Sequence, residues 1–403
     1  MTSKRLSLAG KAACVIGFTC LAFASYAADS DFETFAREQR AGVQQSKNDF
    51  EAYKDELKKE FELYKNAYDR ALEKQRKRVT PRWGEYREGG KEVWVSYERD
   101  DSIRRSVNFR TGEVELETVI PRGEKQEQAV QLLRAQILDL FRETENSVYN
   151  KDDIAQAVEK ELAGNKKVVT GKPTTRPAMQ ALMPELDNTN SAPDLARKAE
   201  QNAAIDTRKS ALPDKEVVRL KFTLPRTAPE KSRLYDGIVG KVSRKEDVPP
   251  AIIFAVMETE SNFNPLAKSH IPAYGLMQIV PRSAGLDATN YLYGEGRLLS
   301  PSFLYNSDNN IVIGSAYLHV LYHQYLGKIE NPVSRLYCTV AAYNTGAGNV
   351  AKAFGHGTNI KRATQSINQL SPKQVYATLL KKLPHAETRR YLKDVSLRLE
   401  KYQ

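Results

Sequence analysis

The sequence predicts an α+β protein in which an all-α C-terminal domain follows a small α+β N-terminal domain with a long helix and an antiparallel sheet. Three observations support this fold class. Apolar residues first recur every three or four positions, then alternate between positions 92 and 119. From residue 232 the helical spacing continues almost to the end. The length of 403 residues fits two ordinary domains plus linkers.

Residues 1–28 are expected to be a signal peptide. Three positive side chains precede an apolar run over residues 12–24, and small residues follow it up to Ala28. This order is typical of a secretory signal, and the run is too short for a comfortable membrane span. A lipid anchor on Cys20 is the alternative, but residues 17–19 match the required pattern poorly. We therefore expect a soluble periplasmic protein, with association to the outer membrane left open.

Cleavage of the signal peptide changes the charge and the cysteine content. Three positive charges leave with it, so the net charge falls from +11 to +8. Only Cys338 remains in the mature chain, which excludes an intramolecular disulfide. A basic exported protein suits an anionic partner, such as a cell-wall polymer or a phospholipid surface. Nucleic acid is not expected as a partner, because the chain is exported.

Residues 29–165 are expected to form the N-terminal domain. Apolar spacing predicts a long amphipathic helix from Phe32 to about Arg78. Alternation then predicts strands, and turn chemistry at residues 110–112 joins two of them into a hairpin. Helical spacing returns at residues 126–144. The strands are predicted at 92–97, 106–109 and 114–119.

The rest of the chain divides into three segments. Residues 166–214 are rich in Lys, Thr, Pro, Asn and Ala, which is typical of a linker. Residues 215–229 contain a strand-like run that we expect to return to the N-terminal sheet. Residues 230–403 are expected to form the helical C-terminal domain.

Two carboxylates lie at the end of a helix predicted between Pro250 and Asn264. The body of this helix is almost wholly apolar, so we expect it to be buried. Glu258 and Glu260 each follow apolar residues by three or four positions. Burial and the negative end of the helix both favour the protonated form, which a general acid in glycoside cleavage needs. Spacing alone does not choose between these two glutamates.

Further sequence blocks follow Glu260-Ser261 in a fixed order. This ordered set resembles the soluble-lytic-transglycosylase family of peptidoglycan lyases, which share the goose-type lysozyme fold. The resemblance covers about residues 230 to 403 and implies a lysozyme-like catalytic domain. An N-terminal α+β domain is similar to that of a membrane-bound branch of the family. The later blocks are Gly275-Leu276-Met277-Gln278, Ala342-Tyr343-Asn344 and Pro384-His385-Ala386-Glu387-Thr388-Arg389-Arg390-Tyr391.

The resemblance implies that Glu260, the glutamate directly before serine, is the catalytic residue. It would protonate the glycosidic oxygen between MurNAc and GlcNAc and then take a proton from the MurNAc C6 hydroxyl, closing a 1,6-anhydro ring. No metal or cofactor is expected. The implied partner is peptidoglycan, with a membrane or cell-wall protein as a further candidate for the N-terminal domain. Substrate-binding roles are implied for Ser269, Gln278, Tyr343, Asn344 and Glu387.

Two other functions and one other site are compatible with the sequence. The same fold could serve a hydrolytic, lysozyme-like muramidase or a non-catalytic cell-wall-binding protein. His319 and His323 have the i, i+4 spacing of a metal pair. The residues between them lack the glutamate of a zinc protease, so we expect a structural role.

Overall fold

The computed structural model describes residues 59, 61–165, 167–224, 226–269 and 272–403. The expected signal peptide and the first part of the long helix lie outside this range. Residues 60–403 form one compact unit. Among the described residues, no helix is both long and apolar enough to cross a membrane.

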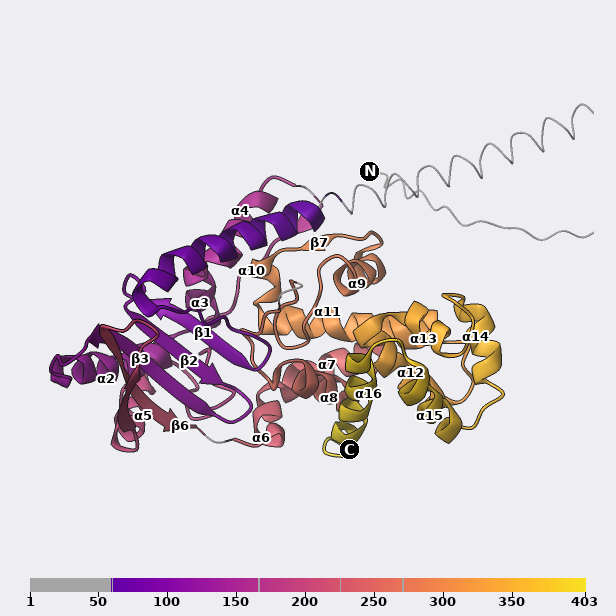
Figure 1. Cartoon of the computed structure of the whole chain (residues 1–403). Coiled ribbons are helices and arrows are strands. Elements are labelled where there is room, and N and C mark those ends of the chain that lie inside the picture. Colours follow the sequence, from indigo (N-terminus) through magenta and orange to yellow (C-terminus); the bar gives the residue numbers. More distant parts are fainter. Residues whose placement is uncertain (1–58, 60, 166, 225, 270–271) are drawn as a thin grey trace, which may run out of the picture. The chain divides into compact units, whose positions relative to one another are not determined.

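A five-stranded antiparallel sheet builds the N-terminal part of this unit (Figure 1). Three strands follow one another in the chain: β1 (Val93–Glu98), β2 (Ile103–Asn108) and β3 (Glu113–Pro121). β6 (Lys215–Thr223) returns to pair with β3 along the whole length of both strands. β5 (Ala204–Lys209) pairs with β6 and completes the order β1-β2-β3-β6-β5.

Helices cover both faces of the sheet. On one face, α2 (Glu127–Arg142) contacts β3 and β6, and α5 (Ala192–Gln201) packs beside it. On the other face, the helix over residues 61–83 places the buried Trp83 against Val217 of β6. The short helices α3 (Glu145–Lys151) and α4 (Asp153–Leu162) follow α2, and α4 contacts a helix of the C-terminal part.

The segment 166–214 corrects the expectation of a linker. It contains β4 (Val168–Val169), α5 and β5, and β4 pairs in parallel with β7 (Leu298–Leu299) of the C-terminal part. Met179, Leu182 and Leu186 are buried in the main core. A few apolar residues in a polar segment are enough to pin it down, and composition alone hides them.

The loop over residues 84–92 is anchored on the sheet. The Arg87 backbone N–H donates to the Tyr97 hydroxyl at 2.8 Å. The Arg87 guanidinium reaches Glu115 and Glu117 of β3 at 3.2 and 3.3 Å. Burial tends to raise the pKa of Glu117, but Arg104, Arg87 and Arg208 outweigh it and hold that pKa below its ordinary value. Charged side chains on the central strand β3 therefore fix this loop to the sheet.

The C-terminal part is helical, which confirms the predicted fold class. α8 (Pro250–Ser261) lies at its centre and packs against α7 (Asp236–Glu246), α11 (Ser307–His319) and α16 (Ala386–Leu399); in Figure 1 it stands between the sheet and α16. α11 continues into a π-helical stretch, Val320–Tyr325. The helices are α6 (Ala228–Ser232), α7 (Asp236–Glu246), α8 (Pro250–Ser261), α9 (Ala284–Tyr293), α10 (Pro301–Leu304), α11 (Ser307–His319), α12 (Pro332–Thr345), α13 (Ala347–Ala353), α14 (Ile360–Ile367), α15 (Pro372–Lys382) and α16 (Ala386–Leu399), with a 3-10 turn at Arg233–Tyr235.

Leu186→Ala tests whether the segment 166–214 belongs to the core. Leu186 is 0% exposed, so truncation should lower the free energy of unfolding by about 2–5 kcal/mol in urea titrations. Leu63→Ala is the matched control, because Leu63 is 52% exposed and should cost less than about 0.5 kcal/mol. If both substitutions changed the free energy of unfolding by the same small amount, the segment would be a linker and not part of the core.

Candidate active site

α8 carries the two candidate carboxylates and ends in an unusual turn. Pro250 occupies the first helical turn, where its missing N–H costs nothing. At the other end Asn262 has a φ of 51° and caps the helix, donating its backbone N–H to the Glu258 carbonyl at 3.1 Å. Phe263 follows with a φ of 63°. Two successive left-handed residues without glycine turn the chain sharply just after Glu260.

Glu258 is bound to the C-terminus of the chain. Its carboxylate accepts hydrogen bonds at 2.7 Å from both Lys401 Nζ and the Tyr402 hydroxyl, and it lies 3.1 Å from Arg398 Nε. Burial tends to raise the pKa of Glu258, but these partners outweigh it and lower that pKa. Every carboxylate oxygen is thus engaged, so Glu258 serves to tie α8 to α16 and the end of the chain.

Glu260 has a different environment. Its side chain is 5% exposed and pairs with Lys91, whose Nζ lies 2.9 Å from Oε2. Lys91 belongs to the 84–92 loop of the N-terminal part. The sequence led us to expect an environment that only favours the protonated acid. The structure adds a fixed ammonium beside the carboxylate, a partner that the sequence did not predict.

Ser261, directly after the candidate acid, has a structural role. Its hydroxyl lies 2.8 Å from the Leu276 carbonyl and 3.0 Å from the Met257 carbonyl. The first contact joins the end of α8 to the segment 274–279. Tyr343 of α12 supports the same segment by donating its hydroxyl to the Met277 carbonyl at 2.8 Å. Three of the sequence blocks are therefore held together by hydrogen bonds to backbone carbonyls.

The segment 274–279 passes very close to α11. Gly275 has a φ of 73°, and a Cβ there would lie 2.4 Å from the Asn310 side-chain amide. Asn310 holds the segment by accepting from the Met277 N–H at 2.9 Å and donating to the Tyr274 carbonyl at 2.8 Å. Met277 is fully buried. The glycine is therefore required for close approach, and methionine at this position belongs to the core.

Gln278 is the most promising polar group of this segment for a ligand. It is buried and has a φ of 47°. Its Nε2 donates to the Gly275 carbonyl at 3.1 Å. Its Oε1 is also buried and accepts no hydrogen bond from any described residue. A buried acceptor without a donor is costly, and a ligand N–H would satisfy it.

Two tyrosines face Glu260. Burial raises the pKa of Tyr343 well above its ordinary value, and the charge of Glu260 raises it further. The same two causes, in the same order, raise the pKa of Tyr391 on α16. The Tyr391 hydroxyl is buried and makes no hydrogen bond of ordinary geometry with any described residue. Both phenols therefore remain neutral; the Tyr343 proton is already donated to the Met277 carbonyl, whereas the Tyr391 hydroxyl can still donate one.

The remaining predicted residues lie around this centre. Asn344 accepts a hydrogen bond from the Thr388 hydroxyl at 2.7 Å, which joins the end of α12 to the start of α16. Glu387 is exposed in the first turn of α16, and its charge acts on Lys91. Ser269 is half-buried, and its backbone N–H donates to the Ala273 carbonyl at 3.2 Å. The Asn344 side-chain oxygen therefore links α12 to α16 and does not point to a role in substrate binding.

Sequence reasoning missed three contributions to the site. Lys91 is 169 positions from Glu260 and belongs to a run without recognisable pattern. Tyr391 was given no substrate-binding or catalytic role, yet it faces Glu260. The side chains of Asn262 and Asn264 fix the loop that carries Lys91. Their position right after Glu260-Ser261 was the one available signal.

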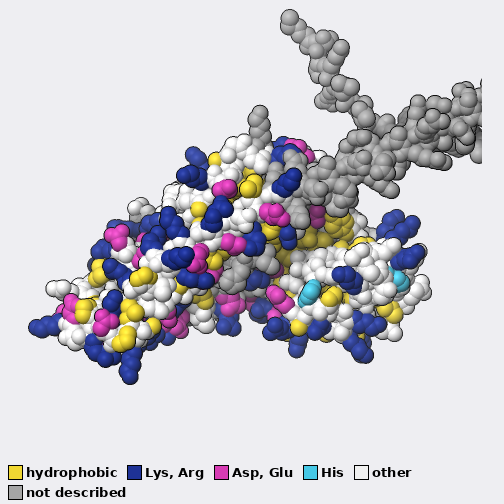
Figure 2. All heavy atoms as spheres, turned by 45° about the horizontal axis from the view of Figure 1, so that its top comes forward, with side chains coloured by type: hydrophobic (Ala, Val, Ile, Leu, Met, Phe, Trp, Pro, Cys, Tyr) yellow, Lys and Arg dark blue, Asp and Glu magenta, His cyan; other side chains and the backbone are white. Residues whose placement is uncertain are grey.

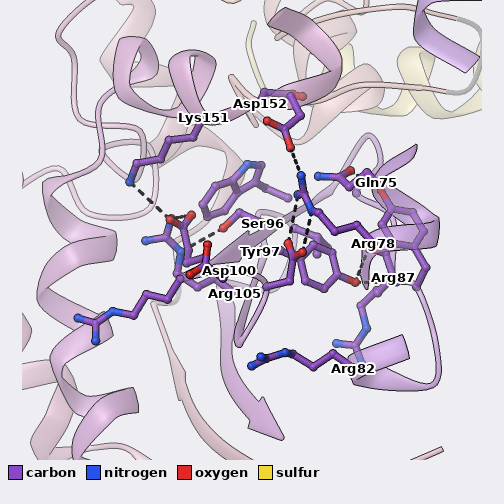
Figure 3. Close-up of a pocket in the computed structure, with 18 of the residues that line it drawn as sticks. Gln75, Arg78, Arg82, Arg87, Ser96, Tyr97, Asp100, Arg105, Lys151 and Asp152 are labelled. Carbon is purple, nitrogen blue, oxygen red and sulfur yellow. Dashed lines mark hydrogen bonds and ion pairs between the residues drawn. The ribbon is translucent and has the colours of Figure 1, made fainter. Parts of the chain in front are cut away.

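A large cavity lies away from Glu260. It has a volume of about 980 Å³, and Figure 3 shows it between the end of helix 61–83, β1 and the α3–α4 junction. Most of its charges are paired within the protein: Arg78 lies 2.7 Å from Asp101, and Lys151 lies 2.5 Å from Glu143. Glu260 does not line it. Its paired charges leave little reactive chemistry, so size does not make this cavity the catalytic centre.

The histidine pair has a structural role. His319 Nδ1 lies 2.7 Å from the Glu246 carbonyl, and His323 Nε2 lies 2.9 Å from the Asp247 carbonyl. Both histidines thus bind the end of α7, where Asp247 adopts a φ of 50°. Across the described residues, no group of three or more His, Cys, Asp or Glu side chains is arranged to hold a metal ion.

Comparisons with known proteins define the class. Residues 237–366 match the family model described as the transglycosylase SLT domain. This range contains α8 and the segments around Gln278 and Tyr343. A solved complex of the 70-kDa soluble lytic transglycosylase with bulgecin A is 19% identical with a TM-score of 0.37, covering 70% of this chain and 37% of that chain. Nothing of its binding site is transferred at this level of likeness.

Curated relatives give the family. Membrane-bound lytic murein transglycosylase C of Klebsiella pneumoniae (strain 342) is 33% identical over 335 residues, which cover 80% of this chain and 85% of that protein. The protein of the same name from Sodalis glossinidius (strain morsitans) is 45% identical over 173 residues, covering 43% of this chain. The chain spans about half the length of the latter, 48%. The chain belongs to the lytic murein transglycosylase family.

Glu258→Gln tests the structural role of Glu258 through pH. The folded-state pKa of Glu258 is lowered from 4.5, so its stabilisation is complete above that value and is lost as pH falls through the folded pKa. We expect the variant to be about 3 kcal/mol less stable at pH 7, with the difference shrinking at strongly acidic pH. Urea unfolding across pH measures this. Glu295→Gln, at a 61% exposed carboxylate, is the control, and a pH-independent difference for Glu258→Gln would contradict the assignment.

Proposed function

We propose that this protein cleaves the β-1,4 glycosidic bond between MurNAc and GlcNAc in peptidoglycan and leaves a 1,6-anhydroMurNAc end. The observation that carries the proposal is the contrast between the two helix-end glutamates. Glu258 is held by two cations and a phenol, whereas Glu260 pairs with one cation, and that cation is partly exposed. Glu260 is therefore the carboxyl group that remains available for proton transfer.

One carboxyl group is sufficient for this reaction. In the first step, protonated Glu260 gives its proton to the glycosidic oxygen, and the bond from that oxygen to MurNAc C1 breaks. In the second step, the MurNAc O6 attacks C1, and the ionised Glu260 takes the O6 proton. The products are the anhydro sugar and a GlcNAc with a free 4-hydroxyl. Atoms balance without water, and Glu260 ends as it began.

Two groups near Glu260 fit a substrate of this class. The buried Oε1 of Gln278 is an unsatisfied acceptor, and the N–H of a 2-acetamido group is a donor of the right kind. Tyr343 and Tyr391 supply neutral hydroxyls beside the carboxylate. We assign Gln278 to the acetamido group and Tyr391 to a hydrogen bond that positions the acid or the sugar. Tyr343 donates to the Met277 carbonyl, so we propose that it binds substrate only as an acceptor. Ser269 and Glu387 are proposed as outer substrate contacts, and Asn344 as a support.

The proposed location is the periplasmic side of the cell envelope. Relatives named membrane-bound suggest association with a membrane, and the basic net charge, which is +11 for the whole chain and +8 without the three positive residues of the expected signal peptide, suits an anionic wall or lipid surface. Figure 2 shows Lys and Arg side chains over both the sheet-bearing and the helical regions of the visible face. Contact of the N-terminal part with a membrane or wall protein is part of the same proposal.

Glu260→Gln tests the proposal directly. The amide keeps the shape of the side chain but can neither give nor take the proton, so the rate should fall about 10² to 10⁴-fold or more. The assay is digestion of purified peptidoglycan, with soluble products identified by mass spectrometry. Glu258→Gln, assayed below its melting temperature, should keep the activity, because it removes a carboxylate of the same helix that only binds the C-terminus.

The products decide between the alternatives. Anhydro ends, about 18 mass units below reducing MurNAc because no water is added, are expected for the wild type. Reducing MurNAc ends would instead establish a hydrolytic muramidase on the same fold. Binding to peptidoglycan without any soluble product at every pH would establish a non-catalytic wall-binding protein. Full activity in Glu260→Gln would show that another group is the acid.

A further inference from the structure

We propose that Lys91, supplied by the N-terminal part, is a positioning residue that holds the Glu260 carboxylate and sets the pH range in which Glu260 can act as an acid. This inference rests on the proposed function. It assigns to the N-terminal part a direct share in the catalytic centre, which neither the helical fold nor the sequence blocks around Glu260 provide.

The geometry of the ion pair carries the inference. Lys91 Nζ lies 2.9 Å from Glu260 Oε2, within reach of a charge-assisted hydrogen bond. The Lys91 side chain is 38% exposed, whereas that of Glu260 is 5% exposed. Glu260 is thus held deep in the protein, and solvent reaches the pair mainly on the lysine side. A residue in this position can act on the carboxyl group of Glu260 without contributing to the packing of the hydrophobic core.

The loop carrying Lys91 is docked on the turn that ends α8. Asn264 Nδ2 donates to the Lys91 carbonyl at 3.1 Å, and Asn262 Nδ2 donates to Glu92 Oε1 at 2.8 Å. Glu92 is also paired with Arg110 at 2.9 Å. The docking therefore uses two asparagines that closely follow Glu260-Ser261. Acid and lysine are fixed to one another by the same short turn.

The charged and titratable groups around the pair come from three directions. The 84–92 loop contributes Lys91 and Glu92, α12 contributes Tyr343, and α16 contributes Glu387 and Tyr391. Burial tends to lower the pKa of Lys91, but Glu260, Glu387 and Glu92 outweigh it and raise that pKa. Lys91 therefore stays charged through the neutral range. It is the cation of this group that touches Glu260.

A fixed ammonium has a defined effect on a general acid. It stabilises the ionised form of the neighbouring carboxyl group, so the group gives up its proton more readily. The rate of an acid-dependent reaction then begins to fall at a lower pH than it would without the cation. Removing the charge should let Glu260 keep its proton to higher pH. The basic limb of the pH–rate profile should move accordingly.

The test compares Lys91→Met with Lys91→Arg. The first removes the charge at similar length, and the second keeps it. Lys125→Met is the control for net charge, because Lys125 is an exposed lysine of the same N-terminal part. The initial rate of release of soluble fragments from purified peptidoglycan is measured from acidic to basic pH at low substrate concentration. Melting temperatures establish that each variant is folded.

The inference predicts that the basic limb moves to higher pH in Lys91→Met alone. The ratio of its rate to the wild-type rate should then rise severalfold along that limb, while Lys91→Arg and Lys125→Met follow the wild type. A folded Lys91→Met with a lower rate but an unmoved limb would reduce Lys91 to a structural contact. Failure of Lys91→Met to fold would also overturn the inference, since a partly exposed active-site group is not required for folding. A wild type that releases no fragments would instead defeat the proposed function.

Discussion

The turn at the end of α8 is the constraint on which the site depends. Within a few residues the chain places Glu260, binds the segment 274–279 through the Ser261 hydroxyl, and docks the 84–92 loop through Asn262 and Asn264. Asn262 and Phe263 adopt left-handed conformations to do so, at an energetic cost that the surrounding hydrogen bonds offset. The proposed catalytic acid, the segment that carries Gln278 and the N-terminal part are therefore joined at one turn.

The same helix shows how environment separates two identical side chains. Glu258 and Glu260 are both buried and only two positions apart. That spacing turns them to different sides of α8, one toward the C-terminus of the chain and the other toward the 84–92 loop. Partners that saturate a carboxylate make it structural. Glu260 has a single, partly exposed cation as its partner, which is why we propose it as the group that transfers the proton.

Local sequence patterns predicted much of this fold. The features that depend on long-range contacts could not be predicted from them. Alternation and turn chemistry located β1, β2, β3 and β6, and proline and apolar spacing located α8, because these signals act within a few residues. Lys91 could not be found in this way, since its role depends on a contact across 169 positions. The core residues of segment 166–214 were hidden by polar neighbours. The part of the long helix before residue 59 lies outside the described residues.

The central claim is that the reaction occurs at Glu260 and not in the charged cavity lined by Arg78 and Lys151. A crystal structure of Glu260→Gln with a bound MurNAc–GlcNAc oligosaccharide tests it most directly. The account predicts the glycosidic oxygen within about 3 Å of the side-chain amide that replaces the Glu260 carboxyl group, and an acetamido N–H donated to Gln278 Oε1. A sugar chain seated in the cavity lined by Arg78 and Lys151, with position 260 out of reach, would contradict it.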